Sequence, residues 1–271
     1  MVVLITGTSS GIGLATAVQA LEAGHQVVAT MRDTSRADAL RAAAPGVDVR
    51  QLDVTDSDSV TAAIAGVIAD YGRLDAVVNN AGAGHIGTVE TDSVENFREV
   101  METNFFGVVQ VTKAAMPHLR ASRGRLVTVT SVGGVVGQPF NEAYCAAKFA
   151  VEGMMESLAP IAAKHGVTVT VVEPGAVASE FVANVGVDRD TMFDTAGPYA
   201  AELKNYVGRT STSFAGAQTS SEAAGTVLAA LTDEHPPFRM QTSDWARQFT
   251  GLKLADLDGS AVQNLTAAWI S

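Results

Sequence analysis

The sequence predicts a doubly wound α/β fold, in which helices cover both faces of a parallel sheet of about seven strands. Short apolar runs rich in β-branched residues alternate with helical stretches from the first residue onward, as in βαβ units. Each run has the length of a strand that is buried on both faces, which is typical of parallel sheets. No repeat, low-complexity tract or linker interrupts the series. Residues 1–271 are therefore expected to form a single domain.

The expected elements follow one another in strict alternation. The strands are Val2–Thr6, Gln26–Thr30, Val47–Leu52, Asp75–Asn79, Arg125–Ser131 and Thr168–Glu173, with Phe238–Gln241 as a candidate seventh. The helices are Ile12–Ala23, Arg36–Ala44, Ser57–Tyr71, Val94–Leu119, Ala143–Lys164 and Ser221–Leu231. The pattern breaks after Pro174-Gly175. Residues 176–220 are rich in Gly, Ser and Thr yet carry aromatic side chains, which favours an irregular substrate-binding lid.

Composition and charge exclude several classes of function. An apolar fraction of 47% supplies a large core, and a net charge of −11 disfavours nucleic acid as a partner. The chain has one cysteine, Cys145, and no Cys/His grouping with metal-ligand spacing, so no metal site is expected. No apolar run reaches the ~18 residues that span a bilayer. Because the first strand begins at Val2, there is no room for a signal peptide, and we expect a cytoplasmic protein without a membrane partner.

A glycine-rich turn follows the first expected strand and leads directly into a helix. Glycine lacks a Cβ atom, so a pyrophosphate can approach the backbone, where the free N–H groups and the positive end of the helix face it. The strand before the turn and the helix after it favour nucleotide binding over a turn that binds nothing. The residues expected at the phosphates are Gly7, Ser9, Ser10, Gly11, Ile12 and Gly13.

Five motifs occur in a fixed order along the chain. They are Thr6-Gly7-x-x-x-Gly11-x-Gly13, Asn79-Asn80-Ala81-Gly82, Ser131, Tyr144-x-x-x-Lys148 and Pro174-Gly175. This series resembles that of the short-chain dehydrogenase/reductases, a family of Rossmann-type oxidoreductases, over about residues 2–179. Within the family, the run Val28–Arg32 is most similar to that of NADP-dependent hydroxysteroid and retinol dehydrogenases. The resemblance implies an enzyme that interconverts an alcohol and a carbonyl group.

The choice of cofactor is expected to depend on the end of the second strand. An acidic residue there would bind the ribose hydroxyls of NAD and repel the 2′-phosphate of NADP. In this sequence Met31 is followed by Arg32, whose guanidinium can make two charge-assisted hydrogen bonds to a phosphate. Asp33 could pair with Arg32 instead. We expect NADP(H) to be preferred, with NAD(H) still possible.

The resemblance implies further contacts to the cofactor. In the family's order they are Asp53 and Val54 at the adenine ring, Asn80, Ala81 and Gly82 at the ribose, and Pro174, Gly175, Val177 and Ser179 at the nicotinamide. The serine at 179 stands where the family usually has threonine. An aspartate near a strand end often only caps a turn, so that interpretation of Asp53 stays open.

The catalytic chemistry is expected at a tyrosine and a lysine four residues apart. Tyr144 and Lys148 project from one face of a predicted helix. A phenol has a reference pKa of about 10, which a nearby ammonium should lower. Tyr144 could then exchange a proton with the substrate oxygen while hydride moves. Ser131, at the end of the fifth strand, is expected to orient the substrate carbonyl.

The resemblance adds two roles at this end of the site. It gives Lys148 a second task, holding the nicotinamide ribose, and makes Asn104 a fourth catalytic residue that holds a water between the lysine and solvent. Taken alone, an asparagine in the middle of a helix would be interpreted as a packing or solvated residue. The family also uses the two long helices, Val94–Leu119 and Ala143–Lys164, to form a dimer or tetramer. We therefore expect a homo-oligomer.

The lid suggests the class of small-molecule substrate. Residues 179–214 carry five aromatic side chains and no basic cluster. The five are Phe181, Phe193, Tyr199, Tyr206 and Phe214. This composition favours a lipophilic ketone or secondary alcohol over a sugar or a phosphorylated metabolite. The alternative is that the aromatic residues only pin the loop to the domain.

Three other functions share parts of this pattern. Nucleotide-sugar epimerases have the Tyr/Lys pair but a different glycine spacing and a larger C-terminal domain. A reductase of carrier-bound 3-oxoacyl chains would share every catalytic residue, although an acidic carrier suits a basic surface better than a net charge of −11. A non-catalytic nucleotide sensor would typically lack the tyrosine or the lysine, and this chain has both.

Overall fold

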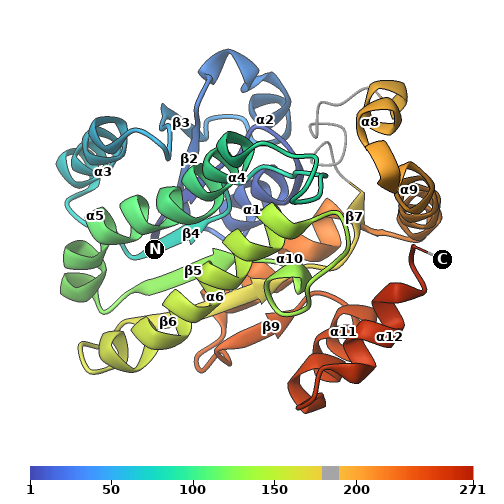
Figure 1. Ribbon diagram of the computed structural model, residues 1–271. Helices are drawn as coiled ribbons and strands as arrows, with labels where there is room; N and C mark the ends of the chain where they lie inside the picture. Colours follow the sequence, from blue (N-terminus) through green and yellow to red (C-terminus); the bar gives the residue numbers. More distant parts are fainter. Residues whose placement is uncertain (179–188, 271) are drawn as a thin grey trace.

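The computed structural model describes residues 1–178 and 189–270, which contain one parallel sheet of seven strands (Figure 1). Its strands lie in the order β3-β2-β1-β4-β5-β6-β9. Their bounds are β1 Val2–Thr6, β2 Gln26–Met31, β3 Asp48–Gln51, β4 Ala76–Asn79, β5 Arg125–Val129, β6 Thr168–Glu173 and β9 Arg239–Gln241. The order reverses between β1 and β4. In sheets of this type, ligands bind at that switch point, beyond the carboxyl ends of the strands.

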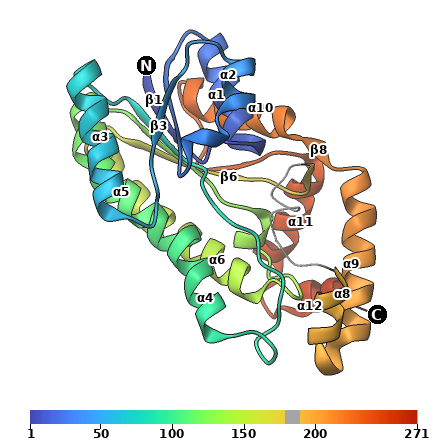
Figure 2. The ribbon, with the colours of Figure 1, turned by 90° about the horizontal axis from the view of Figure 1, so that it is seen from above.

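Helices cover both faces of the sheet, as Figure 2 shows from above. The cluster around Val3, Ile5 and Val27 packs on one face against α1, α2 and α10, and the cluster around Leu4, Val77 and Leu126 packs on the other against α3, α5 and α6. The bounds are α1 Gly11–Glu22, α2 Asp38–Ala43, α3 Ser57–Tyr71, α5 Gly107–Ser122, α6 Glu142–Ala163 and α10 Ser220–Thr232. The predicted single-domain, doubly wound α/β fold is confirmed.

One predicted helix is interrupted. The stretch expected as a single helix from Val94 to Leu119 is α4, Val94–Met101, then a π-helical turn, Glu102–Phe106, then α5. A π turn widens the helix and is often found at functional sites. Here it carries the buried Asn104.

The segment expected to be irregular contains helices. Its described part holds β7 Val177–Ala178, α8 Arg189–Thr195, a 3₁₀ turn Gly197–Tyr199, α9 Ala200–Ala215 and β8 Gln218–Thr219. β7 and β8 pair in parallel. After β9 come α11, Asp244–Ala255, and α12, Ser260–Ala267. For the described part, the expectation of an irregular segment was wrong, because Ser and Thr lower helix propensity only weakly and tertiary packing supplies most helical stability.

These added helices share a core of their own. α8, α9, α11 and α12 lie together at one side of the molecule, in orange and red in Figure 1. Met192, Leu203, Phe249 and Trp269 pack there with Val135 from the chain that follows β5. This third cluster therefore packs against the chain that follows β5. None of the described helices combines the length and apolar character needed to cross a membrane.

Candidate active site

The turn between β1 and α1 leaves space that only glycine can provide. Gly7 has a φ of +71°, and a Cβ atom there would lie 2.8 Å from the Ala81 Cα. At Gly13 a Cβ would lie 2.3 Å from both the Gly7 carbonyl oxygen and the Asn80 Nδ2. Side chains at these positions are therefore excluded by neighbouring backbone.

The end of β4 is tied to this turn by hydrogen bonds. Asn80 donates from Nδ2 to the carbonyl oxygens of Thr6 and Gly7, at 2.9 and 3.0 Å. The Thr6 hydroxyl oxygen accepts from the backbone N–H groups of Asn80 and Ala81, both at 3.0 Å. The sequence prediction placed Asn80 and Ala81 at the ribose, and it missed that Asn80 also holds the phosphate turn in shape.

The same turn suits an anion. Helix α1 begins at Gly11 after Ser10 as N-cap, and its first turn, which the structure describes fully, contains no acidic residue. The unpaired N–H groups and positive end of the helix are thus not neutralised by the chain itself. Ser9, Ser10, Gly11 and Ile12 are all partly exposed here. The residues present fit a pyrophosphate.

The end of β2 exposes a guanidinium. Arg32 is exposed, and Asp33 accepts a hydrogen bond from the Ser35 backbone N–H at 2.9 Å. A hydrogen bond from the Ser35 side chain is the main reason why the pKa of Asp33 is lowered; the bond from the Ser35 N–H comes next, and Arg36 and Arg32 contribute less. Asp33 therefore caps the turn Thr34–Arg36, and its carboxylate is not committed to Arg32.

Asp53 and Val54, shortly after the end of β3, make contacts within the protein. One carboxylate oxygen of Asp53, Oδ1, accepts from the Thr55 backbone N–H at 2.9 Å and from the Thr55 hydroxyl at 2.8 Å. Val54 is buried against Gly107, where a Cβ would lie 2.7 Å from a Val54 methyl group. Both residues thus have structural roles whatever they contribute to an adenine site.

Asn104 is held rigidly beside Gly82. Its side chain is fully buried, its Oδ1 accepts from the Ala83 N–H, and its Nδ2 donates to the Ala83 carbonyl oxygen, both at 2.9 Å. A Cβ at Gly82 would lie 2.7 Å from the Asn104 Oδ1 and 3.7 Å from the Lys148 Nζ. The side-chain amide is therefore used to fix the loop after β4, next to the lysine.

Ser131 and Tyr144 meet at the carboxyl end of β5. Ser131 is the N-cap of the 3₁₀ turn Val132–Gly134, and its hydroxyl oxygen accepts from the Gly133 N–H at 2.9 Å. A hydrogen bond joins the side chains of Ser131 and Tyr144. A Cβ at Gly133 would lie 3.3 Å from both. Helix α6 thus brings its tyrosine against the serine that follows β5.

Lys148 lies one turn further along α6 and is buried. Its Nζ donates to the Val129 carbonyl oxygen at 3.1 Å and lies 5.9 Å from the centroid of the Tyr144 ring. Burial lowers the pKa of Lys148 to about 8, and Glu152 acts in the opposite direction. The lysine therefore titrates far closer to neutral pH than an exposed lysine does.

The pKa of Tyr144 differs from the sequence-based expectation. Burial raises it to about 12, while the hydrogen bond with Ser131 acts to lower it. The expected net lowering of this pKa was wrong for the protein chain alone, because desolvation of the buried phenolate is the largest influence and the Lys148 Nζ lies 5.9 Å from the ring centroid. The Tyr144 phenol is thus protonated at neutral pH.

The segment that follows β6 lies beside the chain that follows β5. Val132 donates from its N–H to the Pro174 carbonyl oxygen at 2.9 Å, which places this turn beside Ser131. Gly175 lies against Trp245 of α11, where a Cβ would be 3.1 Å from the indole ring. Val177 is buried in β7. Ser179 lies outside the described residues.

Comparisons with known proteins agree with this geometry. The family model described as short chain dehydrogenase matches residues 1–190. The chain is a short-chain dehydrogenase. It is 36% identical to retinol dehydrogenase 8 of Bos taurus, over 95% of this chain and 86% of that one. It is 37% identical to 17-beta-hydroxysteroid dehydrogenase type 1 of Homo sapiens, over 96% and 82%.

A solved structure shows the same likeness. A short-chain dehydrogenase from Streptomyces avermitilis superposes with a TM-score of 0.79 at 31% identity, covering 98% of this chain and 96% of that one. The expected resemblance to hydroxysteroid and retinol dehydrogenases is confirmed. This short-chain dehydrogenase is an NAD(P)-dependent oxidoreductase that acts on alcohol and carbonyl groups.

The short-chain dehydrogenase has a cavity of about 210 Å³ between the loop after β4, Phe140 and the helices α8 and α9. Its apolar lining is Ile86, Phe140, Met192, Ala196 and Leu203, and its polar lining includes Thr88, Thr91, Asn96 and Thr195. His85 and Asp92, which are hydrogen-bonded to each other, also line it. Neither Asp92 nor the cavity could be found from a sequence motif. The signal available was only a histidine close behind the Asn-Asn-Ala-Gly turn.

The described aromatic residues of the lid have anchoring contacts. The buried Tyr206 hydroxyl accepts from the Asn141 Nδ2 at 2.6 Å, and the Tyr206 ring lies 5.7 Å from that of Phe140. Tyr199 donates to Glu90. Phe193 lies under the Lys204 ammonium, 5.5 Å away. The side chains of Phe181 and Phe214 are outside the described residues. For Tyr206 and Tyr199 the contacts favour the anchoring interpretation.

Proposed function

We propose that this short-chain dehydrogenase interconverts a lipophilic secondary alcohol and the corresponding ketone or aldehyde, prefers NADP(H), and uses Tyr144 as its acid–base. The observation that carries the proposal is the convergence of Ser131, Tyr144 and Lys148 at the carboxyl end of β5, next to Gly82. Ends of parallel strands at a switch point are where such sheets bind their ligands.

The residues proposed to hold the cofactor line the strand ends in order. They are Gly7, Ser9, Ser10, Gly11, Ile12 and Gly13 after β1, Arg32 after β2, Asp53 and Val54 after β3, Asn80, Ala81 and Gly82 after β4, Tyr144 and Lys148 on α6, and Pro174, Gly175, Val177 and Ser179 after β6. When bound, the nicotinamide gives or accepts the hydride. Because the Arg32 guanidinium is exposed and Asp33 is engaged elsewhere, a 2′-phosphate can be met there.

The chain's own groups handle the proton. A phenol whose pKa is about 12 keeps its proton at neutral pH and can donate it to a carbonyl oxygen. The Ser131 hydroxyl, fixed by the Gly133 N–H, can donate to the same oxygen as negative charge develops on it. Lys148 places a positive charge behind the phenol, which favours Tyr144 in its deprotonated form after the transfer. Asn104 is proposed to hold the loop at Gly82 in a fixed position next to Lys148.

The lining of the cavity supports a lipophilic substrate. Phe140, Met192 and Leu203 present apolar surface, and all three are buried in the third cluster. The polar residues at the cavity include the His85–Asp92 pair and no arginine or lysine, so a phosphate or carboxylate group would find no cation among the described lining residues. From the proposed lid, residues 176–220, the described Met192 and Leu203 contribute to this lining.

A cofactor and substrate screen tests the proposal. The purified protein would be given ketones and alcohols with NADPH, NADH, NADP⁺ or NAD⁺, and turnover followed at the nicotinamide absorbance. We expect turnover of hydrophobic ketones with NADPH, at a higher kcat/KM than with NADH. Turnover of sugars but not of hydrophobic ketones would contradict the substrate class, and a preference for NADH would contradict the role of Arg32.

We further propose a homo-oligomer. Phe106 and Phe149, on the π turn and on α6, are 46% and 40% exposed, and Ile161 at the other end of α6 is 64% exposed. Large apolar side chains along one helix are costly to leave in water. Light scattering should give a mass of two or four chains. The substitution Phe149→Glu, at an exposed phenylalanine, should lower this mass.

A further inference from the structure

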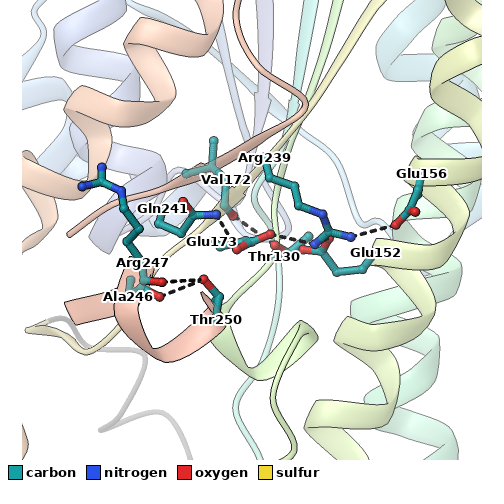
Figure 3. A network of polar contacts seen from close by, with 10 residues as sticks. All are labelled: Thr130, Glu152, Glu156, Val172, Glu173, Arg239, Gln241, Ala246, Arg247 and Thr250. Atoms are coloured by element: carbon teal, nitrogen blue, oxygen red, sulfur yellow. Dashed lines mark hydrogen bonds and ion pairs between the residues drawn. The ribbon is translucent and has the colours of Figure 1, made fainter. Parts of the chain in front are cut away.

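A buried ionic cluster lies directly behind the catalytic lysine. Glu152 follows Lys148 by one turn of α6, is 3% exposed, and its Oε2 accepts from the Arg239 Nη1 at 2.7 Å. Arg239 comes from β9, and the same Nη1 donates to Oε1 of the buried Glu173 on β6, at 2.8 Å. Figure 3 shows Arg239 directed between these carboxylates. Three segments distant in sequence thus meet one turn from the active site.

The cluster contains more negative than positive charge. Besides Glu152 and Glu173, Arg239 contacts the exposed Glu156 through Nη2 at 2.8 Å. Gln241 donates to the second oxygen of Glu173 at 2.9 Å. One guanidinium therefore serves three carboxylates, and buried charge must be compensated by a partner. The nearest other cation on α6 is the buried Lys148.

No further charged group faces Glu152 from the described elements packed on α6. On the side of the 3₁₀ turn Val132–Gly134 it meets Gly134, where a Cβ would lie 3.0 Å from the Glu152 Cγ. The α4 side of α6 is apolar, with Ala143 and Ala147 against Val100. The charged groups that influence the carboxylate are thus Lys148 on its own helix, Glu173 on β6 and Arg239 on β9, and the Thr130 side chain adds a neutral hydrogen bond.

We propose that Glu152, held in place by Arg239, is a positioning residue that keeps the buried Lys148 in its charged ammonium form. This inference rests on the proposed function, since Lys148 matters through its effect on Tyr144 and on the cofactor. Neither the glycine motif nor the Tyr/Lys spacing indicates it. The anion contacts neither substrate nor phenol and acts only through the lysine.

The titration of the two groups supports this arrangement. Burial raises the pKa of Glu152 to about 7, and Glu173 adds to the rise, whereas a hydrogen bond with the Thr130 side chain and, to a lesser degree, Arg239 and Lys148 oppose it. Burial lowers the pKa of Lys148 to about 8, and Glu152 opposes that fall. Each group therefore favours the charged form of the other. Removing the anion should lower the pKa of Lys148 below 8, so that the ammonium is lost at a lower pH.

The lysine can be observed directly, without substrate or turnover. The chain has five lysines, so protein labelled with ¹³C at lysine Cε gives five signals, and Lys148→Met assigns the one of interest. We expect its titration in wild type near pH 8. Glu152→Gln, which keeps the shape and removes the charge, should move that midpoint down by about 0.5 pH unit or more. Glu152→Asp keeps the charge and should bring the midpoint most of the way back to its wild-type value.

A matched control separates charge from packing. Glu156→Gln also removes a carboxylate that contacts Arg239, but at an exposed site, so the Lys148 midpoint should stay where it is in wild type. If Glu152→Gln does not fold, wild type alone still decides the question. Its Lys148 signal should then show a small second step near pH 7, where Glu152 ionises. An unmoved midpoint in Glu152→Gln, or a single step in wild type, would overturn the proposal.

Activity provides a second readout. In ketone reduction, the fall of kcat/KM at alkaline pH should shift to lower pH in Glu152→Gln by the same amount as the lysine midpoint. A pH-independent loss of activity would instead mark Glu152 as merely structural. This outcome can be separated from the proposed function. If the wild-type protein were inactive but Glu152→Gln still lowered the Lys148 midpoint, the proposed reaction would be rejected and the coupling between Glu152 and Lys148 would remain.

Discussion

The nucleotide end and the substrate end of this site are held together by different kinds of contact. At the nucleotide end, backbone meets backbone: Gly7 and Gly13 approach Ala81 and the Gly7 carbonyl so closely that a single Cβ does not fit. At the substrate end, side chains meet side chains: Leu203 comes from α9, Phe249 from α11 and Trp269 from the turn after α12. The first kind of contact fixes the residue type, and the second fixes only apolar character and volume.

This difference means that one end can vary while the other cannot. A cradle of glycines has almost no tolerated alternatives, whereas an apolar cluster tolerates repacking if its volume is kept. The family can thus keep one cofactor end and change its substrate. The proposed catalytic residues lie at the border, since Ser131 follows a strand of the sheet and α6 carries Tyr144 and Lys148 beside the third cluster.

The largest expected effect is at that border. Tyr144→Phe keeps the ring and removes the proton, so turnover should fall by at least ~10²-fold while NADPH still binds, as measured by its fluorescence. Lys148→Met should lower turnover and also weaken NADPH binding, because it loses the charge beside the phenol and the proposed ribose contact. Tyr71→Phe, which alters a tyrosine on α3, is the control and should keep full turnover. Retained activity in Tyr144→Phe would remove this residue from the mechanism.

The next largest effect tests the nucleotide end. Arg32→Ala should weaken NADPH binding by about 10- to 150-fold, the equivalent of roughly 1.5–3 kcal/mol for a lost charged hydrogen bond. NADH has no 2′-phosphate, so its affinity should change little. Arg41→Ala on α2, an exposed arginine with only a 3.9 Å ion pair to Asp38, is the matched control. Equal losses for both cofactors would show that Arg32 does not select between them.

A third change tests the glycine cradle itself. Gly13→Ala places a Cβ against the Gly7 carbonyl, and the overpacking should cost about 1–3 kcal/mol in the free energy of unfolding, together with loss of NADPH affinity. Gly225→Ala in α10 has open space around it and should stabilise by roughly 0.5–1 kcal/mol. Urea unfolding of both variants measures the contrast. Equal stabilities would mean that the turn can move aside.

The same contrast explains what the sequence could reveal. The positions of the strands and the glycine-rich turn depend on local patterns of glycine and apolar residues, and the grouping of Ser131, Tyr144 and Lys148 depends on motif spacing; these patterns are visible in the sequence. The π turn at Asn104, the helices α8, α9, α11 and α12, and the Glu152–Arg239 cluster depend on contacts between distant segments. The pKa of Tyr144 was missed for the same reason, since burial is set by the whole fold.

A smaller effect tests how the lid is attached. Tyr206→Phe leaves the Asn141 Nδ2 with only the Pro139 carbonyl as acceptor, so α9 should be destabilised by about 0.5–1.5 kcal/mol. Faster amide exchange in residues 200–211 would report this, with NADPH affinity unchanged. Tyr199→Phe removes an exposed hydrogen bond to Glu90 and should change exchange by less. Loss of NADPH affinity in Tyr206→Phe would contradict the separation of the two ends.

The smallest effect per step concerns the substrate end alone. If the cavity lined by Phe140, Met192 and Leu203 receives the body of the substrate, each added methylene should stabilise the transition state by up to ~0.8 kcal/mol, or about fourfold in kcat/KM. The gain should stop once the cavity of about 210 Å³ is filled. Hydroxylated ketones of matched length are the control, since a hydroxyl placed against Phe140, Met192 and Leu203 would lack a partner there and be costly to bury. A flat series, or a preference for the hydroxylated ketones, would mean that these side chains only pin the lid to the domain.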